Sequence, residues 1–153
     1  MCSIIFLAKI MIIIKLFCNF TCKIYIVMLK ELFIVGLGSF FGGGLRFLVS
    51  KLIQTSAAFP FPFATFLVNI LGCFFIGLLS GLPYSGRYLT PTMKVLLTTG
   101  FCGGFTTFST FMNESASLMK DENYYLLILY LFGSMLVGML AVLVGHFLAK
   151  TFA

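Results

Sequence analysis

Four apolar stretches, each long enough to cross a membrane as a helix, constrain this 153-residue chain more than any other feature. A hydrocarbon core about 30 Å thick needs roughly 20 apolar residues in a helix. Short polar or proline-containing segments separate the stretches, which run over Leu32–Ile53, Phe61–Leu82, Val95–Asn113 and Tyr124–Ala149. Only 9% of the residues are charged, too few to cover the surface of a soluble domain. The sequence predicts an all-α integral membrane protein with four transmembrane helices.

Residues 1–27 precede this four-span domain, which we place at residues 28–153. The leading segment is apolar but carries Lys9, Lys15 and Lys23, which make a membrane span costly. It also lacks the charge order and cleavage site of a signal peptide. Either it forms an interfacial helix, or translation begins at Met28. We favour the second interpretation because the spans begin directly after Met28.

The positive charges of the four-span domain are evenly divided between the two ends of the predicted helices. One side would hold Lys30, Arg87, Lys94 and Lys150, and the other would hold Arg46, Lys51 and Lys120. Four charges against three fix no clear orientation under the positive-inside rule. The balance permits insertion in both orientations and hence an antiparallel dimer, although it can also arise by chance.

Small residues recur four apart in the spans. Gly38 and Gly42 form one such pair, and Ser134 and Gly138 form another. Small pairs let helix backbones approach closely in a membrane. The pattern indicates close helix packing, either within one chain or between two.

The third stretch has a polar segment, Gly103 to Phe111, where four hydroxyl residues follow two adjacent glycines. Each glycine lowers helix propensity by about 1 kcal/mol relative to alanine, so we expect the helix to break at the glycine pair. Irregular backbone at membrane depth is tolerated only where protein buries it or where it lines a water-filled cavity. Its carbonyls would suit a cation, and its N–H groups and hydroxyls would suit an anion. The alternative is a glycine kink that only packs helices.

Four further side chains are candidates for handling an anion, each with a structural alternative. Phe108 and Phe111 share a helix face, and their positive ring edges could face an anion, or the rings could simply pack. Asn69 lies in mid-span and could donate its amide N–H to an anion or to a neighbouring helix. Arg46 could gather anions in a vestibule or anchor to lipid headgroups. Glu114, expected just beyond the third span, could pair with Arg or Lys at a helix end.

The sequence gives little support for a metal site or a catalytic site. The five cysteines have no metal-ligand spacing, and the single histidine, His146, has no acidic neighbour in the sequence. Paired carboxylates, a nucleophile beside a histidine and a phosphate-binding loop are absent from the sequence. We therefore expect that the protein is not an enzyme.

The motifs together resemble those of the Fluc (CrcB) family of fluoride channels. The resemblance covers about Met28 to the C-terminus. Its motifs are Gly42-Gly-Gly-Leu-Arg46-Phe, then Pro62-Phe-Ala-Thr-Phe-Leu-Val-Asn69-Ile-Leu-Gly72, and last Gly100-Phe-Cys-Gly-Gly-Phe-Thr-Thr-Phe-Ser-Thr-Phe111 followed by Glu114.

The resemblance implies a multi-pass channel in the inner (plasma) membrane that exports fluoride passively and protects the cell from its toxicity. It also implies an antiparallel, dual-topology homodimer whose third helix is broken in mid-membrane. A structural Na⁺ would lie at the dimer interface on the carbonyls of Gly103 and Thr106, Arg46 would stand at the vestibule, and Glu114 would have a structural role. The implied fluoride-path residues are Asn69, Phe108, Ser109, Thr110, Phe111, Tyr130 and Ser134.

Two other functions remain open. A small proton-coupled antiporter is also a four-span, dual-topology dimer, but it needs a carboxylate inside the membrane. By the predicted boundaries no acidic residue lies inside a span, which argues against this function. A non-transporting membrane scaffold would leave the polar segment of the third span unexplained.

Overall fold

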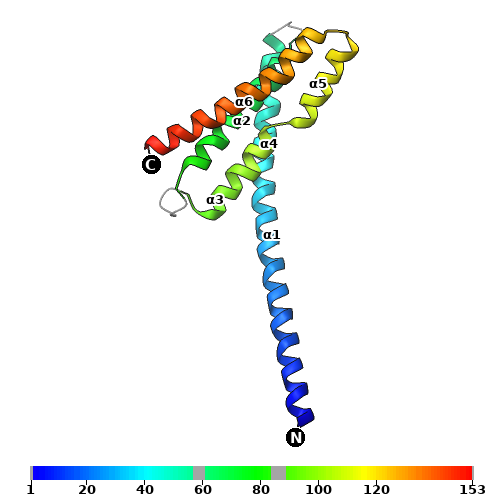
Figure 1. Ribbon diagram of the computed structural model, residues 1–153, viewed down its shortest axis with the longest axis vertical. Coiled ribbons are helices and arrows are strands. Elements are labelled where there is room, and N and C mark those ends of the chain that lie inside the picture. The colour runs from blue at the N-terminus through cyan, green and yellow to red at the C-terminus, as the bar shows by residue number, and fades with distance from the viewer. Residues whose placement is uncertain (1, 57–60, 84–88, 153) are drawn as a thin grey trace. The chain divides into compact units, whose positions relative to one another are not determined.

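The computed structural model describes residues 2–56, 61–83 and 89–152, with side chains described from Ile24 to Gln54 in the first helix. The described residues are helical, and they form no strand. The helices are α1 (Cys2–Ser56), α2 (Phe63–Gly81), α3 (Pro91–Val95), the π-helical segment η1 (Leu96–Cys102), α4 (Gly103–Phe105), α5 (Phe108–Lys120) and α6 (Tyr124–Phe152) (Figure 1).

Four stretches of the described residues are long and apolar enough to cross a membrane. They are Ile24–Gln54, Phe63–Gly81, Pro91–Lys120 and Tyr124–Phe152. This confirms the prediction of an all-helical, multi-pass membrane protein. The third stretch extends beyond its predicted end at Asn113, because α5 continues as a helix to Lys120.

The chain divides into two compact units, Met1–Phe33 and Ile34–Ala153. The first unit is formed by α1 alone, which is helical from Cys2. The second unit contains the rest of α1 and every other helix, so it holds all the candidate site residues. Whether residues 1–27 are an interfacial segment or precede the true start stays a prediction.

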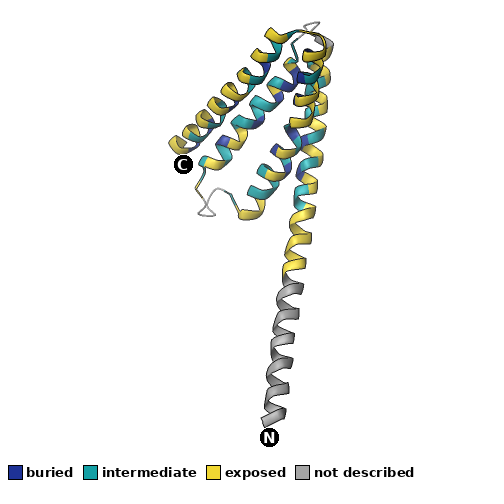
Figure 2. Cartoon of the chain, turned by 45° about the vertical axis from the view of Figure 1, so that its right-hand side comes forward, coloured by how far each residue is buried: buried dark blue, intermediate teal, exposed yellow. Residues whose placement is uncertain are grey.

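Within the second unit, α2 and α6 lie side by side (Figure 1). Glycines on both helices make this approach possible, because a Cβ atom at Gly77 would overlap the carbonyl oxygen of Val142. A Cβ atom at Gly145 would lie 2.8 Å from the backbone nitrogen of Leu78. The residues of α6 away from α2 are largely exposed (Figure 2), as expected for a helix that faces lipid. Close backbone contact replaces the hydrophobic driving force that lipid removes.

The glycine pair of α1 packs inside the chain, against the third span. A Cβ atom at Gly38 would lie 2.8 Å from the Cα atom of Gly100, and one at Gly42 would overlap the carbonyl oxygen of Phe101. On the opposite side of the contact, a Cβ atom at Gly104 would lie 2.7 Å from the carbonyl oxygen of Ser39. Glycines 38 and 42 therefore serve packing within one chain, which the sequence pattern left open.

The third span changes its backbone conformation several times. Thr90 caps its start by accepting the Met93 N–H at 3.2 Å, and Pro91 takes a first-turn position where no N–H is needed. The π-helical turn of η1 and the short α4 follow, and α4 ends at Phe105. Thr106 and Thr107 are extended, with φ/ψ of −81°/158° and −147°/113°, before α5 begins at Phe108.

The non-helical residues of this span are the two threonines, whereas the sequence indicated the glycine pair. Gly103 has helical dihedral angles of −62° and −38°, and Gly104 belongs to the same helix. For Gly104 the physical reason is the close approach of α1, a packing requirement that outweighs its low helix propensity. Thr107 interrupts the helix because its hydroxyl caps a new one, accepting the Thr110 N–H at 3.3 Å.

Candidate functional site

Asn69 of α2 pairs with the backbone of Thr107 at the interruption between α4 and α5. The Thr107 N–H donates to Asn69 Oδ1 at 2.8 Å, and Asn69 Nδ2 donates to the Thr107 carbonyl at 3.2 Å. Both amide atoms of a half-buried side chain are thus used on one extended residue. Thr107 itself is buried, with 8% of its surface exposed. Asn69 therefore donates to a neighbouring helix, one of the two roles expected for it. Its second Nδ2–H remains for another acceptor.

Gly72 lies one turn after Asn69 and gives the interruption room. A Cβ atom there would overlap the side-chain methyl group of Thr106. The Thr106 hydroxyl donates to the Cys102 carbonyl at 3.0 Å, and the Thr106 N–H donates to the same oxygen at 3.0 Å. Within the motif Asn69-Ile-Leu-Gly72, Asn69 thus forms hydrogen bonds with Thr107. Gly72 leaves room for the side chain of Thr106.

Three hydroxyl groups gather at the start of α5. Thr107 Oγ1 donates to Thr110 Oγ1 at 2.9 Å and lies 3.4 Å from Ser109 Oγ. Ser109 and Thr110 are themselves exposed. Both were predicted as site residues, whereas Thr107 was not, although threonine is a usual residue at the start of a helix.

Glu114 of α5 lies between two other helices. Thr65 Oγ1 donates to Glu114 Oε1 at 2.8 Å, and the Tyr130 hydroxyl donates to Glu114 Oε2 at 2.7 Å. Thr65 is 4% exposed and Tyr130 is fully buried. Both carboxylate oxygens of Glu114 thus accept from neutral hydroxyls, and its pairing with Arg or Lys stays a prediction. The position differs from the predicted one just beyond the third span, since Glu114 lies inside the membrane-long stretch Pro91–Lys120.

The two contacts of α2 with the third span lie on one face of α2. Asn69 follows Thr65 by four residues, so both side chains lie on the same side of the helix. Their partners, Thr107 and Glu114, are seven residues apart, or about two turns of α5. Together they produce a line of polar groups between α2 and α5 in an otherwise apolar protein.

Two aromatic side chains of α5 have opposite exposures. Phe111 is 7% exposed and packs against Tyr130, with ring centroids 4.8 Å apart. Phe108 is 74% exposed, and its ring centroid lies 6.1 Å from that of Phe111. The two rings are neighbours, as their spacing predicted, but only Phe111 belongs to the interior of this chain.

Ser134 lies one turn after Tyr130 on α6, and its hydroxyl oxygen is buried. Among the described residues, Ser134 Oγ is a buried side-chain atom that lacks a hydrogen-bond partner. A buried hydroxyl without a partner costs about 1–3 kcal/mol, so a native protein usually supplies water or a ligand to it. Ser134 thus extends the polar line from Glu114 and Tyr130 along α6.

The carbonyls of Gly103 and Thr106 fit a role in binding a cation. In a continuous helix these carbonyls would accept the N–H groups of Thr107 and Thr110. Those N–H groups instead donate to Asn69 Oδ1 and Thr107 Oγ1. Two hard oxygen acceptors are left close to the interruption, and Gly103 is exposed on this chain. Backbone carbonyls of this kind coordinate alkali cations in channels.

Arg46 is half-buried on α1, one turn after Gly42. In the described parts of the chain, no hydrogen bond or ion pair connects it to Asn69 or to Glu114. The structure therefore brings together the polar candidates of α2, α5 and α6, while Arg46 stands apart from that cluster.

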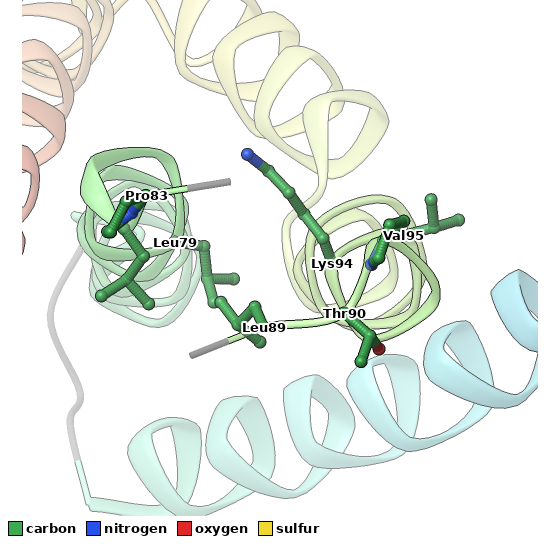
Figure 3. Close-up of a pocket in the computed structure, with 8 residues that line it drawn as sticks. Leu79, Pro83, Leu89, Thr90, Lys94 and Val95 are labelled. Carbon is green, nitrogen blue, oxygen red and sulfur yellow. The ribbon is translucent and has the colours of Figure 1, made fainter. Parts of the chain in front are cut away.

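Two apolar cavities lie away from the polar line. The larger has a volume of about 600 Å³ and is lined mainly by leucine and phenylalanine side chains of α1, α2, η1 and α6. The smaller, of about 200 Å³, lies where α2 ends and α3 begins, with Leu79 and Leu89 meeting beside Lys94 (Figure 3). Neither cavity is lined by Asn69, Glu114 or Tyr130. We take the polar line as the candidate site, because it gathers hydrogen-bonding groups between the helices, whereas both cavities are lined mainly by apolar side chains.

Half-buried amide and carboxylate groups meet buried hydroxyl groups between membrane-long helices, and they define a multi-pass membrane protein with a polar site between its spans. The sequence pattern described as "CrcB-like protein, Camphor Resistance (CrcB)" matches residues 33–146. A protein of Azobacteroides pseudotrichonymphae named fluoride-specific ion channel FluC is 46% identical over 125 residues, which are 82% of this chain and 100% of the relative.

Two further relatives carry the same name. The protein of Chlorobaculum tepidum is 47% identical over 122 residues, covering 80% of this chain and 96% of its own length. The protein of Bacteroides fragilis is 41% identical over 128 residues, covering 81% and 99%. The chain belongs to the CrcB-like family.

Proposed function

We propose that this protein is a fluoride-specific ion channel of the plasma membrane. It lets fluoride leave the cell down its electrochemical gradient and so protects the cell from fluoride toxicity. The observation that carries the proposal is the combination of family membership with a polar line of neutral donors between the spans. It acts as a channel and not as an enzyme.

The fluoride path follows the polar line and the rings beside it. Fluoride is small and strongly hydrated, and moving such an ion into a low dielectric costs on the order of 20 kcal/mol in the ideal limit. The path must therefore replace water's hydrogen bonds nearly one for one. The second Nδ2–H of Asn69 and the hydroxyls of Ser109, Thr110 and Ser134 act as donors, and the ring edges of the phenylalanines add positive potential. The path residues are Asn69, Phe108, Ser109, Thr110, Phe111, Tyr130 and Ser134, and Arg46 gathers anions at the vestibule.

The functional unit is an antiparallel, dual-topology homodimer with two paths. The balanced charges of the two chain faces support insertion in both orientations. Phe108 is 74% exposed on the single chain, and Gly103 is exposed as well. In a dimer these two residues would meet the partner, so that each path combines the ring of one chain with groups of the other.

The third helix is broken in mid-membrane, at Thr106 and Thr107, and the break binds a structural Na⁺ at the dimer interface. Support comes from the Gly103 and Thr106 carbonyls, whose helical N–H donors are directed to other acceptors. The bound Na⁺ would supply positive charge that stabilises the break and neutralises carbonyl dipoles. Glu114 is a structural partner of Thr65 and Tyr130. Residues 1–27 are an extension that transport does not require.

A proton-coupled antiporter is the second candidate, and one observation favours it. Such a carrier needs a carboxylate within the membrane, and Glu114 is a carboxylate within a membrane-long stretch. We favour the channel because both carboxylate oxygens of Glu114 are occupied by hydroxyl donors, which hold the group in place. The name of the relatives points the same way.

A measurement of net charge movement distinguishes the channel from the antiporter. The full chain is placed in liposomes loaded with potassium fluoride, without a pH gradient, and external fluoride is followed with an electrode. A channel carries net charge, so we expect fast efflux only after valinomycin lets potassium follow. Efflux that ignores valinomycin but depends on an imposed pH gradient would support the antiporter and contradict the channel.

A further inference from the structure

We infer that Asn69 is a positioning residue for the cation site, because its amide diverts the N–H group that would otherwise close the third helix over that site. The inference rests on the Na⁺ proposed above. It assigns to Asn69 a task on the backbone of Thr107, in addition to its contact with a passing anion.

The contact between Asn69 and Thr107 fixes the orientation of the amide. A backbone N–H can only donate, so the Asn69 atom 2.8 Å from Thr107 N must be the oxygen. The amide nitrogen then lies 3.2 Å from the Thr107 carbonyl, where it donates. The side chain thus accepts the N–H that a helix would direct to Gly103 and adds a donor to the carbonyl, and it does so for a threonine that is buried and extended.

The consequence reaches the carbonyl of Gly103. In a continuous α-helix the Thr107 N–H would donate to the Gly103 carbonyl. With that N–H committed to Asn69, the carbonyl keeps its lone pairs for another partner. One turn later the Thr110 N–H donates to Thr107 Oγ1 at 3.3 Å, so the Thr106 carbonyl is spared in the same way. Asn69 and the Thr107 cap therefore free two oxygens of the same backbone segment.

Loss of Asn69 has a defined structural alternative. The Thr107 N–H would be buried without an acceptor, which is costly, and in an α-helix its acceptor is the Gly103 carbonyl. That bond would extend α4 by one residue and remove a cation ligand. If Asn69 made only an ordinary interhelical hydrogen bond, its loss would lower stability by the same amount in Na⁺ and in any other cation. A loss of stability that is specific to Na⁺ therefore tests the inference.

Two substitutions at Asn69 separate positioning from anion contact. Asn69→Asp keeps an oxygen that faces the Thr107 N–H, whereas Asn69→Leu has similar volume and no acceptor. The matched control is Ser39→Ala, which removes a side-chain hydrogen bond to the same span, from Ser39 Oγ to the Gly100 carbonyl at 3.3 Å. Ser39 lies outside the proposed path and the proposed cation site.

The measurement is thermal unfolding of the full chain in detergent, with Na⁺ titrated against an organic cation that cannot enter the site. A cation that binds only the folded protein stabilises it by RT ln(1 + [Na⁺]/Kd), so the Na⁺ concentration at which the unfolding temperature begins to rise reports the Kd and is called here the Na⁺ midpoint. We expect Na⁺ to stabilise the wild type, Asn69→Asp and Ser39→Ala with similar midpoints. Asn69→Leu should raise the Na⁺ midpoint about tenfold, the effect of one hydrogen bond of about 1.4 kcal/mol. Hydrogen exchange of the Thr107 amide should also be faster in Asn69→Leu at high Na⁺.

Three outcomes would overturn the inference. The first is a wild type whose stability is indifferent to Na⁺, which would remove the cation site while leaving fluoride efflux to be judged separately. The second is an unchanged Na⁺ midpoint and unchanged Thr107 exchange in Asn69→Leu. The third is an equal loss of Na⁺ response in Asn69→Asp and Asn69→Leu, which would tie the effect to the amide nitrogen and not to the acceptor.

Discussion

The hydroxyl of Tyr130 donates to the Glu114 carboxylate at 2.7 Å, although both residues lie in membrane-long helices. Tyr130 is fully buried, and its ring also packs edge-on against Phe61, with centroids 5.4 Å apart. A carboxylate among apolar helices is costly unless hydrogen bonds satisfy it. This contact therefore connects α5 to α6 and makes a charged group tolerable at that depth.

Tyr130→Phe should destabilise the protein and slow fluoride efflux. The change keeps the ring but leaves Glu114 with one hydroxyl donor, which costs about 1–3 kcal/mol. Thermal unfolding in detergent measures the loss of stability, and efflux from liposomes measures the loss of transport. The matched control is Tyr124→Phe on the same helix, where the side chain is 57% exposed. Equal stability in the two variants would show that the hydrogen bond to Glu114 contributes nothing.

Phe111→Ile should reduce fluoride efflux at least about tenfold while the protein stays folded. The substitution keeps an apolar side chain but removes the aromatic edge, whose positive potential we propose faces the ion. Core substitutions that keep the apolar character usually cost less than about 1.5 kcal/mol when volume is also conserved. Efflux is compared with Phe132→Ile, which replaces a 68% exposed ring on α6. Normal efflux through Phe111→Ile would remove that ring from the path.

Gly42→Ala should impair folding, whereas Gly44→Ala should not. A methyl group at Gly42 would overlap the Phe101 carbonyl, while nothing lies within 4 Å of the corresponding position at Gly44. Overpacking of this kind costs about 1–3 kcal/mol, and alanine in an open helix position gains up to about 1 kcal/mol. The yield of monodisperse protein and its unfolding temperature give the comparison. Equal behaviour of the two variants would contradict the close packing of α1 on the third span.

A chain that begins at Met28 should transport fluoride at the full rate. All the proposed path and cation residues lie in the unit Ile34–Ala153. Efflux rates of the shortened and full chains are compared at equal protein density in the liposomes. A large loss of activity on removal of residues 1–27 would show that the extension takes part in insertion or transport.

The sequence predicted the number and approximate position of the spans, because long apolar stretches have few other stable environments. It underestimated the third span, which it ended at Asn113. Polar residues continue through α5 to Lys120, and the sequence does not show which of them find partners on other helices. Glu114 is the clearest example, since Thr65 and Tyr130 are 49 and 16 residues away from it in the chain.

The interruption of the third span shows the limit of local propensity. Gly103 and Gly104 are poor helix formers, yet both are helical, and Gly104 allows the close packing of α1 at this point. The extended residues are Thr106 and Thr107, whose conformation is stabilised by Asn69 from another helix. A tertiary contact of this kind leaves no local signal beyond the capping threonine, so the sequence located the polar segment but not the exact residues.

The most direct test of the account is fluoride efflux from liposomes that contain the purified full chain, with chloride-loaded liposomes as the control. The proposed path lacks a charged donor and relies on closely spaced amide, hydroxyl and ring-edge groups that suit a small anion. We predict rapid fluoride efflux in the presence of valinomycin and no chloride efflux above that of empty liposomes. A folded protein that releases neither ion, or that releases chloride as fast as fluoride, would contradict the central claim.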